Sequence, residues 1–214
     1  MPRLLGWSND RVSARVTELL ELFQLDPSLY AAKFPHELSG GQQQRVGVAR
    51  ALAAKPNVLL MDEPFGALDP IIRSKAQDDL LGIQRRFGTT IILVTHDIDE
   101  AFRLGDRVAV MSQGRLLQHD RPAVLLTQPA DPFVAQLTGS GDKSLKLLSL
   151  TTAGEVAEPG NVAGPTVPWS LTLREVLAEL VWSGAAAATV AGPDGNPVGH
   201  VTLASLLARG RQAT

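Results

Sequence analysis

Residues 58–97, VLLMDEPFGALDPIIRSKAQDDLLGIQRRFGTTIILVTHD, decide the fold of this chain. A continuous apolar run stands at each end, over 58–61 and 91–94, and such runs are typical of strands buried on both faces of a parallel sheet. Between them apolar residues recur three and four positions apart, which predicts a helix with Asp69 as its N-cap and Pro70 as its first residue. Strand, helix and strand in this order indicate parallel strands joined by a right-handed crossover.

A second decisive stretch is LSGGQQQRVGVARAL at residues 38–52, which predicts a helix over about 41–54. Ser39 and Gln42 have the S-x-x-Q spacing of a capping box, so one interpretation is an ordinary helix start. The other is an anion site, because small residues let a phosphate approach the backbone and a helix N-terminus offers unpaired N–H groups. The candidate nucleotide-binding residues are Ser39, Gly40, Gly41 and Gln42.

Three further candidates follow the two predicted strands. Asp62 and Glu63 end the first strand, at the edge where ligands gather in open α/β sheets. One carboxylate can hold Mg²⁺, usually through water, and its neighbour can orient or deprotonate an attacking water. His96 ends the second strand and can bond a phosphate oxygen or fix that water. Taken singly, each has a structural alternative, namely a pair of solvated acids or a histidine that only packs.

Order and spacing distinguish these interpretations. Gln42 and Asp62 are 20 positions apart, the segment GALDP occupies residues 66–70, and His96 follows Glu63 by 33 positions. This arrangement resembles the ABC ATPase family, in which the four motifs are the signature, Walker B, the D-loop and the H-loop. The resemblance implies that two motor domains sandwich two ATP molecules, and that the signature of one subunit contacts the γ-phosphate bound to the P-loop of the other.

The resemblance also assigns roles by position. It implies that Asp62 holds Mg²⁺, that Glu63 polarises the attacking water and that His96 senses the γ-phosphate. Asp69 would couple the two sites, and the signature residues 39–42 would act on the partner's ATP. Both ATP and Mg²⁺ are expected only with a P-loop supplied by a missing region or by a partner.

Longer segments are similar to the ATPase subunits of quaternary-amine osmoprotectant importers for glycine betaine, choline or carnitine. They are FPHELSGGQQQRVGVARALAAKP (34–56), MDEPFGALDPIIR (61–73), VTHDIDEAFRLGDRVAVMSQGRLLQHDRP (94–122) and FVAQLTG (133–139). This likeness implies a subunit that energises import through a transmembrane permease and pairs with a second ATPase subunit as a homodimer. It also implies peripheral association with the cytoplasmic face of the plasma (inner) membrane.

The composition changes beyond this region. Residues 151–165 are rich in Gly, Pro, Ala and Thr without an apolar period, which is typical of a linker. A capping box at Thr172 and Glu175 then opens a helix, and VPWSLTLREVLAEL (167–180) with DGNPVGHVTLASLL (194–207) resembles a CBS repeat. We expect an α/β chain with three parts. They are a partial ABC-ATPase motor (helical subdomain plus parallel-sheet core) at 1–144, a linker at 145–165 and a single small α+β CBS-like unit at 166–214.

No P-loop of the form G-x-x-x-x-G-K-[ST] occurs in the sequence. The five lysines stand at 33, 55, 75, 143 and 146, and Lys143 comes nearest, with Leu137 and Asp142 where the two glycines belong. The Q-loop glutamine and the nucleotide-stacking aromatic should also precede the signature. We therefore expect an N-terminally truncated motor that is not an efficient ATPase alone, with an unpaired strand edge, uncovered apolar faces and a tendency to associate.

Bulk composition excludes several classes of partner. Basic and acidic residues nearly cancel, 20 against 22, and no basic run exceeds a pair, so we expect no nucleic-acid partner. Cysteine is absent, which excludes disulfides and thiolate metal sites. No apolar run approaches the roughly 20 residues of a membrane span. The alternative function is a non-catalytic regulatory or remnant protein that uses the CBS-like unit and the motor surface for interaction.

Overall fold

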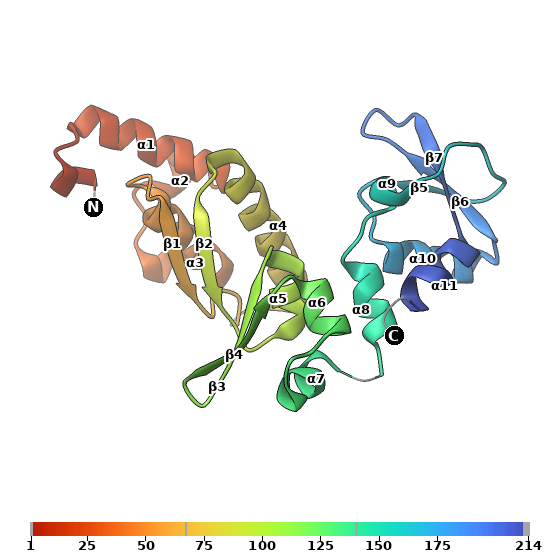
Figure 1. Cartoon of the computed structure of the whole chain (residues 1–214). Helices are drawn as coiled ribbons and strands as arrows, with labels where there is room; N and C mark the ends of the chain where they lie inside the picture. The colour runs from red at the N-terminus through yellow and green to blue at the C-terminus, as the bar shows by residue number, and fades with distance from the viewer. Residues whose placement is uncertain (1, 67, 140, 212–214) are drawn as a thin grey trace. The chain divides into compact units, whose positions relative to one another are not determined.

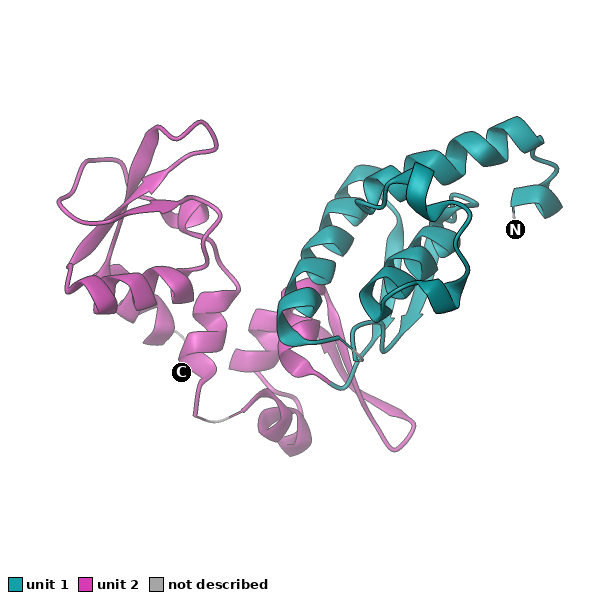
Figure 2. Ribbon diagram, turned by 180° about the vertical axis from the view of Figure 1, so that it is seen from behind, with its two compact units in different colours: residues 1–96 teal, residues 97–214 magenta. Residues whose placement is uncertain are grey.

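The computed structural model describes residues 2–66, 68–139 and 141–211. Ala67, in the segment expected to be the D-loop, lies outside the described residues. The chain divides into two compact units, residues 1–96 and residues 97–214, each described separately below (Figure 2).

The first unit holds the elements that were expected around the two decisive stretches (Figure 1). Asp69 caps the helix between the strands, with Pro70 as its first residue, as predicted. Ser8 caps the first long helix. In chain order the elements are η1 (Pro2–Leu5), α1 (Asn9–Leu22), α2 (Pro27–Tyr30), η2 (Pro35–Glu37), α3 (Gly40–Leu52), β1 (Val58–Asp62), α4 (Pro70–Phe87) and β2 (Thr90–Val94).

β1 and β2 pair in parallel, which confirms the predicted crossover. Leu60 lies opposite Ile92 in the register, and their side chains are 72% and 53% exposed, whereas Leu59 and Met61 on the other face are buried. One apolar face of the two strands is therefore uncovered in the described part of the chain, as expected for a truncated motor. The reason is that α3 and α4 lie on the same side of the two strands in both views (Figures 1 and 2).

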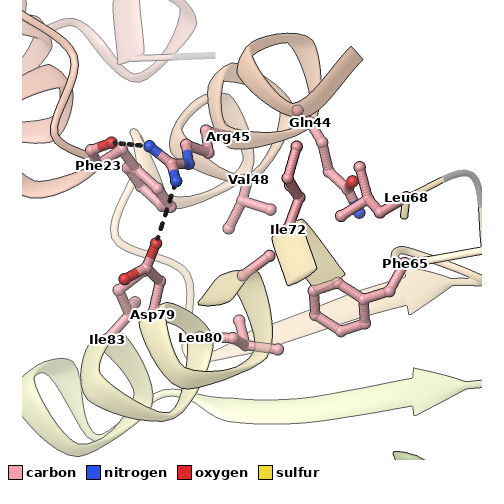
Figure 3. Close-up of a pocket in the computed structure, with 12 residues that line it drawn as sticks. Phe23, Gln44, Arg45, Val48, Phe65, Leu68, Ile72, Asp79, Leu80 and Ile83 are labelled. Atoms are coloured by element: carbon pink, nitrogen blue, oxygen red, sulfur yellow. Dashed lines mark hydrogen bonds and ion pairs between the residues drawn. The ribbon is translucent and has the colours of Figure 1, made fainter. Parts of the chain in front are cut away.

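α3 and α4 meet around a small apolar cavity of about 20 Å³ (Figure 3). Arg45 of α3 closes one side: its Nη1 donates to the carbonyl oxygen of Phe23 at 3.3 Å, and its Nη2 lies 3.8 Å from Oδ2 of Asp79 in α4. A cavity of this size holds about one water molecule. The contact fixes α3, and with it the candidate signature segment, against the helix that begins at Asp69.

Arg15 of α1 is a buried cation that joins three helices, and its side chain is 5% exposed. Its Nη2 donates to the carbonyl oxygen of Leu52 at 2.9 Å, and its guanidinium carbon lies 5.3 Å from the centre of the Phe87 ring. Its Nη1 lies 2.8 Å from Oε2 of Glu18. The hydrogen bond with Arg15 is the largest reason that the pKa of Glu18 lies below its usual value.

Replacing Arg15 with alanine is expected to lower the free energy of unfolding of the first unit by about 2 kcal/mol, because the Leu52 carbonyl loses its charged donor and α1 loses packing. Urea unfolding followed by circular dichroism measures this change. The matched control is Arg11→Ala, because Arg11 is exposed and lies 3.7 Å above the Trp7 ring. If Arg15→Ala lowers the free energy of unfolding by no more than the roughly 0.5 kcal/mol expected of the control, Arg15 does not stabilise the unit as described.

The second unit begins with a helix and a hairpin. β3 and β4 are antiparallel and turn at Gln113 and Gly114, where φ is 50° and 73°, as a two-residue hairpin turn requires. The elements are α5 (Ile98–Leu104), β3 (Val108–Ser112), β4 (Arg115–Asp120), α6 (Pro122–Thr127), α7 (Pro132–Thr138), α8 (Lys143–Ser149), α9 (Ala153–Val156), β5 (Thr166–Pro168), α10 (Leu173–Ser183), β6 (Ala187–Ala191), β7 (Pro197–Thr202) and α11 (Leu203–Arg211). Over the described ranges, each helix is too short or too polar to cross a membrane.

Two separate apolar cores stabilise this unit. The hairpin core consists of Phe102, Val108, Val110, Leu125, Leu126 and Val134. The C-terminal core consists of Leu148, Ala153, Val167, Leu173, Val176, Leu180, Ala188, Val190, Val201 and Leu206. It is formed by the sheet β5-β6-β7 together with α8, α10 and α11, and the predicted capping box at Thr172 and Glu175 opens α10.

The stretch expected to be a linker, 145–165, carries most of α8 and all of α9. The N–H of Ala153 donates to the carbonyl oxygen of Leu171 at 2.7 Å, and Glu158 exchanges backbone hydrogen bonds with His200. α9 was not predicted because its capping box, Thr152 and Glu155, lies in a segment rich in Gly and Pro. The division at residues 144 and 165 stays a prediction.

Candidate functional site

Glu63 and His96 meet at the carboxyl ends of β1 and β2. The N–H of Glu63 donates to the carbonyl oxygen of Val94 at 2.9 Å, which extends the ladder by one residue, and φ of Glu63 is 47°. Nδ1 of His96 lies 2.7 Å from Oε1 of Glu63, with the His96 side chain 81% and the Glu63 side chain 42% exposed. The structure therefore brings together the two residues expected to be catalytic, on a surface that solvent and a substrate can reach.

This pair has the geometry of a carboxylate held by a second group. A carboxylate that orients or deprotonates water must keep one oxygen directed at the water while the other is fixed. The 2.7 Å contact between His96 and Oε1 leaves Oε2 of Glu63 as the oxygen that can face a water molecule. The geometry therefore suits general-base chemistry.

The signature segment forms the capping box that its spacing predicted. The N–H of Ser39 donates to Oε1 of Gln42 at 3.0 Å, and the N–H of Gln42 donates to Oγ of Ser39 at 3.4 Å. Nε2 of Gln42 also donates to the hydroxyl of Tyr30 at 3.0 Å. The structural interpretation of this motif is therefore correct, and it leaves the N-terminus of α3 as an ordered place where an anion could bind.

The two signature glycines differ in their surroundings. A Cβ on Gly41 would lie 3.3 Å from Cγ2 of Ile72, so Gly41 permits α3 to approach α4. A Cβ on Gly40 would meet no described atom within 4 Å, so the backbone at Gly40 is open to a ligand. Of the two, Gly40 is the better candidate for a close approach by phosphate.

The carboxylates of Asp62 and Asp69 differ in their hydrogen bonding and exposure. Oδ1 of Asp69 accepts hydrogen bonds from the N–H groups of Ile71 and Ile72, both at 3.1 Å, so one of its oxygens caps α4. Asp62 is the exposed last residue of β1. Within the described residues no cluster of three or more His, Cys, Asp or Glu side chains could hold a metal ion. Mg²⁺ needs only one or two carboxylates when water and phosphate oxygens complete its shell, so Asp62 fits an ion that arrives with a nucleotide.

A glycine betaine uptake system ATP-binding protein of Escherichia coli, YehX, is 44% identical to this chain over 97% of the chain and 67% of that protein. The chain belongs to the ABC transporter ATP-binding family. The ABC transporter family model matches residues 1–66. The osmoprotectant import ATP-binding protein OsmV of Salmonella typhimurium is 47% identical over 94% of the chain and 52% of its own length. The chain thus spans between about half and two thirds of these relatives.

A solved member of the ABC family supports the α/β fold class. Its structure is that of cbiO1 from Clostridium perfringens, described as part of the ABC transporter complex cbiONQ. It has a TM-score of 0.52 and 32% identity, and the match covers 62% of this chain and 51% of that one. Membership of the ABC family implies ATP and Mg²⁺ as cofactors.

Three hydrogen bonds of this ABC signature segment were missed in the sequence. Nε2 of Gln43 donates to the carbonyl oxygens of Pro35 and Leu38, at 2.9 and 3.1 Å, and Tyr30 accepts the bond from Gln42. The run of three glutamines after the glycines was the available signal, because their amides can bond backbone groups that precede a helix. The segment before α3 is thus held by side chains on both sides of the motif.

Proposed function

We propose that this chain supplies the signature, Walker B, D-loop and H-loop portions of the ATP-hydrolysing subunit of an importer for a quaternary-amine osmoprotectant. The observation that carries the proposal is the 2.7 Å contact between Glu63 and His96 at the ends of adjacent parallel strands. Support for the solute class comes from relatives named for glycine betaine and osmoprotectant uptake, which match more than nine tenths of the chain.

In this mechanism Glu63 is the base. Its Oε2 would accept a hydrogen bond, and then a proton, from a water molecule aimed at the γ-phosphorus, while His96 holds Oε1. Asp62, one residue earlier, would hold Mg²⁺ through water, and the ion supplies positive charge to the phosphate oxygens. Placing both acids at the end of β1 sets the base beside the metal-binding carboxylate.

The signature would act on a nucleotide bound by another polypeptide or segment, because no lysine in the sequence stands in a P-loop. Ser39 and Gln42 cap each other at the start of α3, and the backbone N–H groups of Gly40 and Gly41 would face the γ-phosphate. Asp69 would couple the two sites, since it begins α4, which packs against α3 at Ile72.

The partners proposed are a transmembrane permease and a second ATPase subunit. Peripheral association with the cytoplasmic face of the plasma (inner) membrane follows from the permease contact. Nothing in the composition or in the site favours a nucleic-acid partner.

Action in trans can be measured by mixing this chain with a P-loop-bearing ATP-binding subunit of the same family whose own signature serine has been replaced. We expect the chain alone to hydrolyse ATP at a rate near background, and the mixture to recover a rate about tenfold or more above that of the damaged subunit. Ser39→Ala in this chain should remove the recovery. Glu63→Gln should preserve it, because Glu63 lies on the side of the site that has no P-loop.

A second candidate is a non-catalytic regulatory protein that uses its C-terminal unit and motor surface for interaction. The absence of a P-loop sequence from the 214 residues favours it. In that case the mixture shows no recovery, and Ser39→Ala and the unaltered chain behave alike. Recovery that depends on Ser39 would exclude this candidate.

A further inference from the structure

The hydroxyl group of Tyr30 ends a chain of hydrogen bonds that begins in the signature segment. The N–H of Ser39 donates to Oε1 of Gln42 at 3.0 Å, and Nε2 of Gln42 donates to the Tyr30 hydroxyl, also at 3.0 Å. The oxygen of a side-chain amide accepts hydrogen bonds, whereas its nitrogen donates them. Both bonds form together only when the Gln42 amide has one of its two orientations, so Ser39 and Tyr30 between them select that orientation.

Tyr30 is held in place by contacts that do not involve the signature segment. It is the last residue of α2, whose N-cap is Asp26, and Oδ1 of Asp26 accepts from the N–H and the hydroxyl of Ser28 at 2.8 and 2.7 Å. The N–H of Tyr30 donates to the carbonyl oxygen of Asp26 at 2.9 Å. Leu25, just before the cap, is 3% exposed, and its N–H donates to the carbonyl oxygen of Leu20 at 2.8 Å. α2 is therefore joined firmly to the C-terminal end of α1.

α3 is bound to the same part of the chain at a second point. Arg45 follows Gln42 by three positions, so the two side chains leave the same face of α3. Nη1 of Arg45 donates to the carbonyl oxygen of Phe23 at 3.3 Å (Figure 3). This bond fixes where the helix lies but does not act on the Gln42 amide, whose side-chain torsions need their own restraint. The bonds to Ser39 and Tyr30 supply it, and Tyr30 is the one of these two residues that lies outside the signature.

We propose that Tyr30 is a positioning residue for the signature segment: by accepting the hydrogen bond from Nε2 of Gln42, it keeps Oε1 on the Ser39 N–H and so keeps the first turn of α3 in the form that meets a nucleotide. The nucleotide part of this proposal rests on the proposed function. The chain of hydrogen bonds lies within residues 26–45 and can be measured without ATP. Tyr30 itself touches no nucleotide in this scheme.

The test is Tyr30→Phe in the full chain, which removes one oxygen atom and keeps the ring. Without this acceptor the Gln42 amide can turn away from Ser39, so hydrogen exchange of the Ser39 amide should accelerate about three- to tenfold. The side-chain NH₂ signal of Gln42 should move toward that of a glutamine in water, and Gln42→Glu identifies this signal. Unchanged values of both readouts would overturn the proposal.

The matched control is Ser28→Ala, which removes a hydroxyl group from the same short helix. Oγ of Ser28 donates to Asp26 and not to α3, so neither readout should change. Equal changes in the two variants would mean that the general order of α2, and not the Tyr30 hydroxyl, determines the Gln42 amide, which would also overturn the proposal. In a Gln42→Met background Tyr30→Phe should no longer alter exchange of the Ser39 amide, because the link is already broken. An effect of full size in that background would show that Tyr30 acts by another route.

A second arm uses the mixing experiment. Tyr30→Phe should lower the recovered rate of ATP hydrolysis about three- to tenfold at saturating chain, and leave unchanged the chain concentration that gives half of the recovery. An increase in that concentration with an unchanged maximal rate would indicate a lost contact surface and contradict the proposal. Full recovery by Tyr30→Phe would overturn the positioning role and leave the proposed function intact. If the unaltered chain gives no recovery, the proposed function fails, and the exchange and amide readouts still decide the role of Tyr30.

Discussion

Replacing Glu63 with glutamine is expected to lower the rate of ATP hydrolysis by about 10²- to 10⁴-fold in a site completed by a P-loop. Glutamine keeps the size of the side chain and can still contact His96, but it cannot accept a proton from water. Nucleotide affinity should change little, because Glu63 is proposed to act on the water and not on the phosphate. A large decrease in rate with unchanged nucleotide affinity is typical of a group that acts only in the transition state.

The measurement uses a chimaera in which the P-loop-bearing segment of a family member precedes this chain. Phosphate release gives the rate, and a fluorescent nucleotide gives the affinity. The control is Glu21→Gln, an exposed glutamate at the end of α1, which should retain the full rate. His96→Ala should also be slow, and the double variant should be no slower than Glu63→Gln because the two residues act as a unit. Hydrolysis by Glu63→Gln within about twofold of the unaltered chimaera would remove Glu63 from the role of base.

The second large effect concerns the uncovered face of the sheet. Val58, Leu60, Ile92 and Val94 are 51%, 72%, 53% and 55% exposed and lie on one face of β1 and β2. We expect the chain to self-associate through this face as its concentration rises, because parallel sheets usually have both faces buried. The unpaired strand edge can also pair with a strand of another copy. Leu60→Lys together with Ile92→Lys should weaken association on the order of 10²- to 10³-fold, since each copy loses two apolar side chains.

Sedimentation velocity over a range of concentrations measures this change. The control is Leu29→Lys, because Leu29 is 61% exposed but lies on α2. It should leave association unaltered. A chain that stays monomeric at every concentration and melts in one cooperative, high-temperature transition would contradict the expectation.

Much of the fold could be predicted because local chemistry and tertiary structure agree. Ser39, Asp69 and Thr172 each begin a helix where their hydrogen-bonding side chains predicted a cap. The parallel pairing of β1 with β2 was predicted from two apolar runs separated by a segment with helical spacing of its apolar residues. The apolar runs alone did not predict the uncovered strand face, because periodicity reports what a strand is suited to and not what covers it.

α8 and α9 show a different limit of sequence reasoning. The apolar residues of α8 serve two cores at once, so they lack the single apolar stripe by which a surface helix is recognised. α9 is one turn long and its composition resembles a linker. Contacts between distant segments, such as Glu158 with His200, leave no local pattern.

For the candidate site, the sequence placed Glu63 and His96 at the ends of two successive strands, and the structure shows that the two side chains meet there. It did not predict what holds the signature segment, because Tyr30 lies 12 positions before Gln42 and no periodicity relates them. The roles of all the candidate residues, Glu63 and His96 included, stay predictions until they are measured.

The backbone of Glu63 has a φ of 47°, a left-handed conformation that side chains with a Cβ avoid. For a residue other than glycine or asparagine this conformation costs roughly 1 kcal/mol. A glycine at this position would relax that strain while removing the carboxylate. The fold therefore gives up stability at the residue on which its proposed chemistry depends, and the rest of the first unit must supply the free energy that keeps this turn in place.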